Sequence, residues 1–221
     1  IVTRAYETKV HKTEKEVKIE TTLSISAIYI QRILDIQVTW NIQADGTVDI
    51  AMDVKRNPIF PMLPRFGLRL FLPKEMKDVT YYGLGPVESY MDKRRASWHG
   101  EFSSPVTDLH EDYIRPQENG SHYDCDYVTL SSNAGHLLPE RKTSLTAVSG
   151  QTFSFNASVY TEEELTNKAH HYELEECGST VLCLDYRQNG IGSNSCGPQL
   201  LEKYRLDETE FQFALRLKPE A

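Results

Sequence analysis

The strongest constraint on the fold is a two-residue alternation of apolar and polar side chains. It is clearest in two runs, residues 34–42 and 48–54, which are separated by Ala44-Asp45-Gly46. Successive side chains of a strand point to opposite faces of a sheet, so this period places the apolar residues of each run on one face. A short connection containing Asp-Gly is typical of a β-hairpin. We therefore predict a hairpin with one buried face.

The same period recurs along the chain, and only one segment favours a helix. Further strands are expected at residues 68–72, 153–159 and 211–217. Thr161 and Glu164 have capping-box spacing, and the acidic first turn suits the helix dipole, so a short helix that ends by His170 is predicted. The stretch from Tyr90 to Gly120 is expected to be irregular. Many strands, long loops and almost no helix predict an all-β fold, a large antiparallel sandwich.

Length and composition are those of a globular protein, and binding to nucleic acid or to a membrane is not expected. The 221 residues can bury a sizeable core, and the net charge of −8 disfavours a phosphate-binding surface. The densest basic cluster, Lys93–Arg95, lies beside Asp92 and is interpreted as a solvated turn. No apolar run approaches the roughly 18 residues that span a bilayer. We interpret residues 1–33 as a linker or variable strands continuous with a domain at 34–221, and the chain as a segment of a longer protein.

The cysteines do not predict a metal site. Cys125, Cys177, Cys183 and Cys196 lack CxxC spacing and a paired histidine motif, which argues against zinc. A domain of this size does not need disulfides, so free thiols are expected, at least at Cys196. Cys177 and Cys183 are close enough in sequence to form a bridge if they face each other across a hairpin. No metal or cofactor is expected within this chain.

A glycine-rich segment, NGIGSNSCGP at residues 189–198, raises the question of a binding site. It lacks the Gly-Lys-Ser/Thr end of a phosphate-binding loop. Two interpretations remain open, a plain turn and the wall of a small-molecule pocket. In the second, the glycines allow unusual backbone torsions, and Ser193, Asn194 and Ser195 supply hydrogen-bonding groups.

Three carboxylates, Glu88, Glu118 and Asp185, lie near glycines and are candidates for the lining of a cleft. Retaining glycoside hydrolysis needs two carboxyl groups about 5–5.5 Å apart. Sequence spacing does not show that any two of these side chains meet. No catalytic residue is therefore predicted in this chain.

Four motifs occur together in one order: residues 64–67 (PRFG), 82–90 (YGLGPVESY), 113–120 (YIRPQENG) and 190–198 (GIGSNSCGP). With them the chain resembles the C-terminal domain of the large β-galactosidases of glycoside hydrolase family two, also called the β-galactosidase small chain. The resemblance covers roughly Leu34 to Lys218. It implies a large antiparallel β-supersandwich related in architecture to galactose mutarotase.

The resemblance also implies a role without catalysis. In the family, the two catalytic glutamates belong to a central (β/α)8 barrel, and no segment of this chain resembles one. The chain is therefore expected to be inactive alone, to pack on such a barrel and to complete its pocket for terminal β-D-galactosides such as lactose. Parent enzymes often use Mg and Na in other domains and form homo-oligomers.

For the glycine-rich segment, the resemblance implies a place at the mouth of the barrel. The substrate-binding residues expected there are Cys196, Asn194 and Ser193. Cys196 occupies the place of a tryptophan that stacks on the sugar in some members, and a thiol offers no stacking plane.

Two other functions remain open. One is a free-standing aldose epimerase of the same broad fold, with a general acid and base inside this chain. The other is a carbohydrate-binding module, for which only Trp40 and Trp98 offer stacking planes. Trp40 alternates with polar residues on a predicted strand, so a core position is expected for it.

Overall fold

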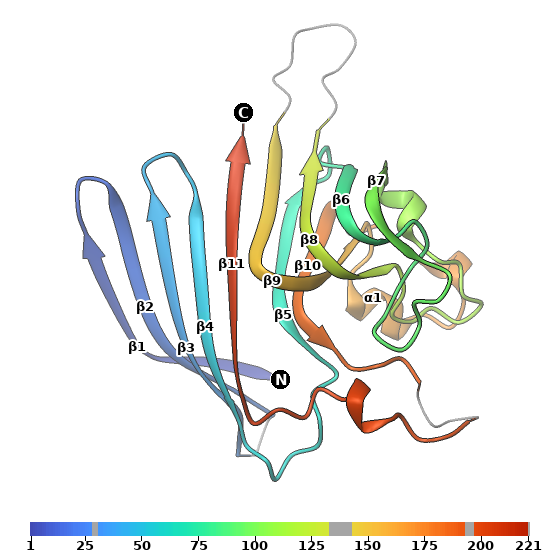
Figure 1. Cartoon of the computed structure of the whole chain (residues 1–221), viewed down its shortest axis with the longest axis horizontal. Helices are drawn as coiled ribbons and strands as arrows, with labels where there is room; N and C mark the ends of the chain where they lie inside the picture. The colour runs from blue at the N-terminus through green and yellow to red at the C-terminus, as the bar shows by residue number, and fades with distance from the viewer. Residues whose placement is uncertain (28–30, 133–142, 193–196, 221) are drawn as a thin grey trace, which may run out of the picture.

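A computed structural model describes residues 1–27, 31–132, 143–192 and 197–220 of the chain (Figure 1). Within this part, eleven strands and one α-helix are formed, and every strand pair is antiparallel. The strands are β1 (Val2–Lys12), β2 (Glu16–Ser26), β3 (Arg32–Gln43), β4 (Val48–Arg56), β5 (Arg65–Pro73), β6 (Asp78–Gly85), β7 (Trp98–Pro105), β8 (Ser121–Ser131), β9 (Ser144–Ser158), β10 (Ser179–Gln188) and β11 (Glu210–Glu220). The helix is α1 (Glu162–Asn167). The predicted all-β antiparallel class with one short helix is confirmed.

The strands form one hydrogen-bonded sheet that divides at β9. Its main path runs β1-β2-β3-β4-β11-β9-β8-β6-β7, and β10 pairs with both β9 and β5. Residues 144–148 of β9 pair with β11, whereas residues 154–158 pair with β10. In Figure 1 the long strands β1–β4 and β11 stand on one side, and the β5–β10 pair belongs to the other half.

Aromatic side chains pack the β5–β10 pair onto the long sheet. Phe66 of β5 meets Phe211 of β11 edge to face, with ring centroids 5.1 Å apart. Tyr186 of β10 stacks on the same ring at 4.7 Å. The sheet therefore acts as two packed layers although its hydrogen bonding is continuous, and this is the sandwich that the alternation predicts.

The predicted apolar faces are the buried faces, except at the end of β3, where Ile42 is 38% exposed. Alternate residues of β3, β4 and β11 belong to the core; these residues are Leu34, Ile36, Val38, Ile50, Met52, Val54, Phe211, Phe213, Leu215 and Leu217. Trp40 packs against this core and is partly buried, as predicted, whereas the side chain of Trp98 is 59% exposed. The hairpin turn contains Gly46 with a φ of +86°, a conformation that glycine adopts without strain.

The N-terminal residues form a hairpin that extends the same sheet. β1 is exposed on both faces, and β2 pairs with β3 through eleven residue pairs from Glu16↔Gln43 to Ser26↔Arg32. The division of the chain at residue 33 remains a prediction. The irregular stretch predicted between Tyr90 and Gly120 was wrong in part, because it contains β7. This strand pairs only with β6 and lies at an edge of the sheet, so it lacks a regular apolar face.

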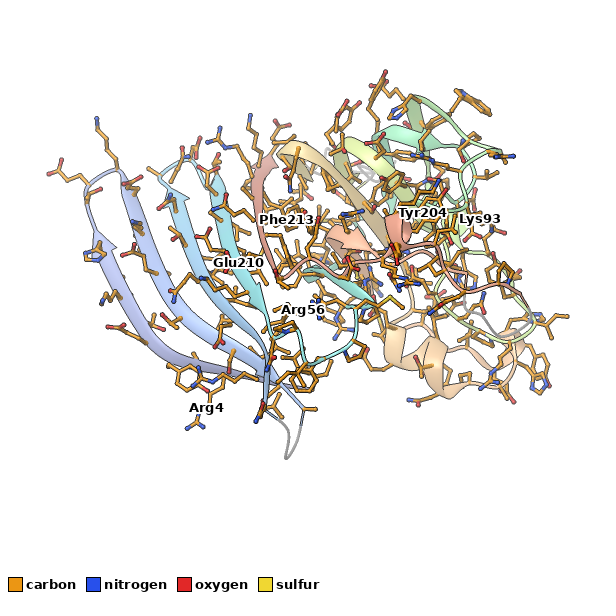
Figure 2. The ribbon with its side chains drawn as sticks, turned by 60° about the horizontal axis from the view of Figure 1, so that its bottom comes forward. Arg4, Arg56, Lys93, Tyr204, Glu210 and Phe213 are labelled. Carbon is orange, nitrogen blue, oxygen red and sulfur yellow. The ribbon has the colours of Figure 1, made fainter. Side chains whose placement is uncertain are left out.

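The ends of two elements are fixed by side chains. The Thr161 hydroxyl accepts a hydrogen bond from the Glu164 backbone N–H at 3.1 Å, which confirms the predicted cap of α1. Arg56, at the end of β4, donates to the carbonyls of Phe60, Asp207 and Glu208 and so ties β4 to the segment before β11 (Figure 2).

None of the helices in the described residues is long and apolar enough to cross a membrane.

Candidate functional site

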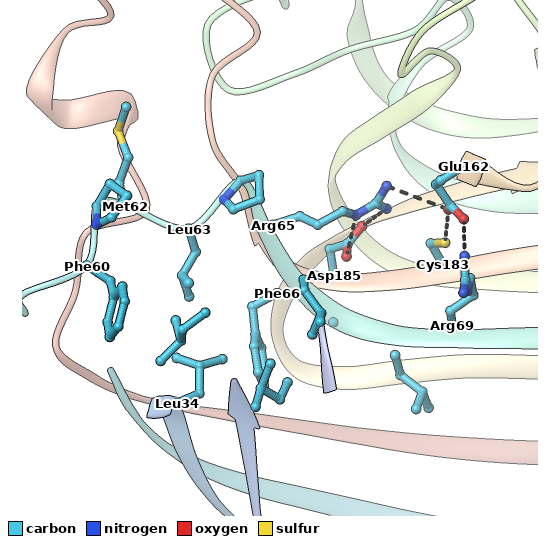
Figure 3. Close-up of a pocket in the computed structure, with 17 residues that line it drawn as sticks. Leu34, Phe60, Met62, Leu63, Arg65, Phe66, Arg69, Glu162, Cys183 and Asp185 are labelled. Carbon is cyan, nitrogen blue, oxygen red and sulfur yellow. Dashed lines mark hydrogen bonds and ion pairs between the residues drawn. The ribbon is translucent and has the colours of Figure 1, made fainter. Parts of the chain in front are cut away.

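The guanidinium of Arg65, the first residue of β5, lies between two of the three candidate carboxylates. Its Nη1 donates to Glu118 Oε2 at 2.9 Å. Its Nε and Nη2 donate to the two oxygens of Asp185 at 3.2 and 2.5 Å, a bidentate ion pair (Figure 3). Asp185 is 2% exposed. Two carboxylates that are 67 residues apart in the sequence therefore meet on one cation.

Strand register and a glycine create this meeting. In the β5–β10 pair, Arg65 lies opposite Gln188 and Gly67 lies opposite Asp185, with a bulge between Asp185 and Arg187. A Cβ atom on Gly67 would lie 2.2 Å from the Leu184 carbonyl oxygen and 2.5 Å from Asp185 Oδ1. Only glycine leaves room for the carboxylate there. The PRFG motif thus supplies both the cation and the space for its partner.

Two amide side chains complete the network around Arg65. Asn156 of β9 donates from Nδ2 to Glu118 Oε1 at 2.8 Å, and its Oδ1 accepts from Arg65 Nη2 at 3.3 Å. Gln188 of β10 donates from Nε2 to Asn156 Oδ1 at 2.9 Å and to Asp185 Oδ2 at 3.2 Å. We call these five residues, Arg65, Glu118, Asn156, Asp185 and Gln188, the Arg65 cluster. It holds β5, β9, β10 and the loop before β8 together.

The environment of the cluster does not suit acid–base exchange with a substrate. Burial raises the pKa of Glu118 and that of Asp185, and the nearby Arg65 guanidinium opposes the increase in both. Each carboxylate is ion-paired, and Asp185 is closed off from solvent. Their convergence therefore forms a structural ion network rather than an acid and a nucleophile on either side of a cleft.

The third candidate, Glu88, joins two of the sequence motifs. It accepts hydrogen bonds from Lys93 Nζ, the Tyr113 hydroxyl and the Gly120 backbone N–H. Burial raises the pKa of Glu88, but these donors outweigh burial, so its pKa lies below its ordinary value. Gly120 has a φ of +66°, and a Cβ there would lie 2.3 Å from the Leu109 carbonyl oxygen. The Glu88 contacts thus explain YGLGPVESY and YIRPQENG as a structural pair.

The base of the glycine-rich segment is held by Asp92. Its Oδ1 accepts from the Ile191 N–H and its Oδ2 from the Gly192 N–H, each at 3.0 Å. The Gly190 N–H donates to the Tyr204 carbonyl at 2.9 Å. Sequence reasoning missed Asp92, because its partners lie about 100 residues away along the chain. The predicted substrate-binding residues Ser193, Asn194 and Cys196 lie outside the described residues.

A cavity of about 530 Å³ lies beside this base. We call it the loop pocket. It lies between the glycine-rich segment and the Arg65 cluster. Its lining residues are Met62, Pro64, Arg65, Glu118, Gln188, Asn189, Gly190, Ile191, Gly192, Gln199 and Leu200. Figure 3 shows a second cavity, which shares Met62, Pro64 and Arg65 with the loop pocket. Its apolar wall, which includes Phe60, Leu63 and Leu34, meets the charged side chains of Arg65, Arg69 and Glu162.

Replacing Gly190 by alanine should destabilise the chain by about 1–3 kcal/mol, the range for overpacking a filled site. A Cβ on Gly190 would lie 2.6 Å from Leu200 Cδ1 and 2.7 Å from Asp92 Oδ2. Urea unfolding measures the effect. Gly197→Ala is the matched control in the same segment, because a Cβ there meets none of the described residues within 4 Å. Equal midpoints for the two variants would show that the Asp92 contact does not require a glycine.

The described cysteines are free thiols. They are Cys125, Cys177 and Cys183. The bridge between Cys177 and Cys183 that their spacing left open is not formed, and the Cys183 thiol instead donates to Glu162 Oε1 at 2.8 Å. Cys196 lies outside the described residues. No group of three or more potential metal ligands occurs in the described part of the chain.

Comparison with known proteins assigns the family. The family model "Beta galactosidase small chain" matches residues 2–217. The chain therefore belongs to the β-galactosidase small-chain family. The match extends to the N-terminal hairpin, beyond the range of Leu34 to Lys218 that carries the motifs.

Curated relatives agree with the family. A β-galactosidase of Actinobacillus pleuropneumoniae is 42% identical over 215 residues, which are 97% of this chain and 20% of the relative. A β-galactosidase of Staphylococcus xylosus is 40% identical over 218 residues, which are 99% of this chain and 21% of the relative. The chain thus spans about a fifth of the length of these relatives.

Among solved structures, the galactose 1-epimerase of Lactobacillus acidophilus NCFM aligns with 97% of this chain and 66% of its own, at 9% identity and a TM-score of 0.46. The fold assignment rests on the strand order of this chain and not on that likeness.

Proposed function

We propose that the chain is the non-catalytic C-terminal domain of a β-galactosidase, where it packs on a catalytic barrel and completes the pocket for a terminal β-D-galactoside. One observation carries the proposal: the chain belongs to the small-chain family, and it matches about a fifth of the length of relatives named β-galactosidase. The paired state of Glu118 and Asp185 supports a role without catalysis, because Arg65 binds both carboxylates.

The glycine-rich segment is the part of the domain that we propose as the pocket wall, with Ser193, Asn194 and Cys196 bordering the galactoside. Its base supports this role because Asp92 fixes Ile191 and Gly192, and a wall must be held in place to orient a ligand. The barrel and the galactoside are thus the proposed partners. A homo-oligomeric parent enzyme, and a chain without a metal or cofactor site of its own, are part of the same proposal.

The wall is tested in a chimera in which this chain replaces the matching segment of the Actinobacillus pleuropneumoniae relative. A wall residue that binds substrate and transition state alike changes KM more than kcat. Asn194→Ala removes one neutral hydrogen bond, so a two- to tenfold rise in KM is expected. Cys196→Trp supplies a stacking plane and should lower KM. Asn167→Ala, at the exposed end of α1, is the control. Unchanged KM in both loop variants would leave the segment a plain turn.

The isolated chain distinguishes the remaining functions. We expect it not to hydrolyse a chromogenic galactoside, because its candidate carboxylates are ion-paired or enclosed by donors. Turnover by the purified chain would contradict the proposal. Interconversion of galactose anomers above the spontaneous rate would instead support the aldose epimerase.

A further inference from the structure

We propose that the open edge of β5 binds an extended polypeptide segment from outside these 221 residues, which pairs with β5 as a further strand. β5 is nine residues long, and among the described residues it pairs with β10 alone. A strand directs half of its backbone N–H and C=O groups to each side, so the other side of β5 presents a row of unpaired groups. The inference deepens the proposed function, because it rests on a longer parent enzyme and names a contact with the rest of it.

The composition of β5 is that of a strand with a neighbour on each side. Residues 66–72 read FGLRLFL, with Arg69 as their only charge, and Phe71 is 56% exposed. β1, at one end of the main path, differs because it carries Lys9 and Lys12 and is interrupted by a bulge. Lysine side chains and bulges are features that keep a natural sheet edge from pairing with another chain. β1 therefore has the character of an edge that stays open, and β5 does not.

The cavity shown in Figure 3 lies at the edge of β5, and we call it the edge cavity. Its volume is about 530 Å³. Both faces of β5 line it: Phe66 and Leu68 lie on the face that packs on the core, and Gly67 and Arg69 lie on the other face. A cavity that touches both faces of a strand borders the side of that strand. The space beside β5 is therefore open to a further backbone.

The sheet face next to the edge cavity is apolar and incompletely covered. Four apolar residues of β2 lie opposite apolar residues of β3, and each is only half-buried; they are Val17, Ile19, Leu23 and Ile25. Ile25 also lines the edge cavity, together with Ile33 and Leu34. In Figure 1 no strand of the β5–β10 half overlies β1–β3. A strand added to β5 would lie about 4.7–4.9 Å further out, over this face.

The edge selects a polypeptide over other occupants. A small apolar molecule can fill the cavity, but it leaves the backbone groups of β5 unpaired. A second copy cannot add its own β5 antiparallel with the apolar face inward, because β1–β3 of both copies would then occupy the same layer. This chain spans about a fifth of the length of its curated relatives, so a relative holds ample further sequence for one strand. We expect a segment as long as β5, with alternate apolar side chains that face β2 and β3.

The test is backbone hydrogen exchange of the isolated chain and of the chimera described above, followed by mass spectrometry. Residues 66–72 should exchange at least about tenfold more slowly in the chimera, because the amides at the open edge gain hydrogen bonds. Residues 154–158 of β9 are the control, because they already have strand neighbours in β10 and β8, and their exchange should be equal in the two proteins.

Two outcomes of this comparison overturn the proposal. One is equal exchange of residues 66–72 in the isolated chain and the chimera. The other is protection of these residues in the isolated chain that grows with its concentration, which would assign the edge to a second copy.

Leu70→Pro and Phe71→Pro distinguish strand pairing from plain burial. Adjacent N–H groups of a strand point to opposite sides, so one proline removes a bond to β10 and the other removes a donor at the open edge. Alanine at the same two positions is the matched control for the lost side chains. Relative to its alanine control, the open-edge proline is the one that lowers the urea midpoint of the isolated chain less.

In the chimera, the open-edge proline should remove most of the added protection of residues 66–69, and its alanine control should not. Full protection in the presence of either proline would indicate burial without strand pairing and would overturn the proposal. The comparison of the native proteins stands even if a proline variant does not fold. Neither experiment measures hydrolysis, so an inactive chimera with a protected β5 would contradict only the galactoside pocket.

Discussion

Replacing Arg65 by methionine is expected to lower the free energy of unfolding by about 3–5 kcal/mol, the range measured when one partner of a buried ion pair is removed. Methionine keeps much of the side-chain volume but leaves Glu118 and Asp185 without their cation. Asp185 has almost no access to water, so its charge cannot be solvated in place. Urea unfolding of the 221-residue chain measures the loss.

Arg69→Met is the matched control on the same strand. Arg69 also binds two carboxylates, those of Glu162 and Glu163, but its side chain is 37% exposed. Exposed ion pairs contribute about 0–1 kcal/mol, so a small effect is expected. Adding Glu118→Gln and Asp185→Asn to the Arg65 variant should recover part of the loss, because the uncompensated charges are removed. Equal effects of the Arg65 and Arg69 variants would contradict the role of the cluster.

Acid should destabilise the chain through His122. This residue of β8 is 1% exposed, stacks on Phe155 with ring centroids 5.1 Å apart, and donates from Nδ1 to the Leu84 carbonyl at 3.3 Å. Burial lowers the pKa of His122 to about 4, below its ordinary value of 6.5. The folded state therefore keeps the ring neutral at pH values where the unfolded state takes up a proton.

The sign of the effect follows from proton uptake. Above about pH 6.5 neither state binds the proton, and stability does not depend on His122. Between about pH 6.5 and pH 4 only the unfolded state binds it, so stability falls by up to about 3 kcal/mol. His122→Phe removes this titration, whereas the carboxylates titrate in both proteins. Urea unfolding at about pH 7 and pH 4.5 should show a loss in the native chain that exceeds that of the variant by about 2–3 kcal/mol. Equal losses would show that His122 is not kept neutral by the fold.

The strands that the sequence predicts are those with one buried face. The β3–β4 hairpin and β11 alternate because they lie in the middle of the long sheet and pack on one layer. β1 and β7 lie at the two edges of the main path; β1 is exposed on both faces, and β7 has no fully buried residue. An edge strand without a fully buried face does not require alternating apolar and polar residues. The two-residue period of the sequence therefore does not identify such a strand.

The site was less predictable than the fold, for a reason of distance along the chain. Glu118 and Asp185 were recognised as candidates, but Arg65 lies 53 and 120 residues away from them, and only the β5–β10 register brings the three side chains together. Asp92 reaches its loop across about 100 residues in the same way. The motifs of the sequence contain these residues, but the sequence does not show which of their side chains are in contact.

The most direct test of the proposed function is galactoside hydrolysis by three proteins measured side by side. They are the isolated chain, the Actinobacillus pleuropneumoniae relative with its matching 215-residue segment deleted, and the chimera that carries this chain in its place. Because the proposed domain completes a pocket, we expect no turnover by the isolated chain or by the deletion. The chimera is expected to hydrolyse a chromogenic galactoside. A folded chimera as inactive as the deletion, or turnover by the isolated chain, would contradict it.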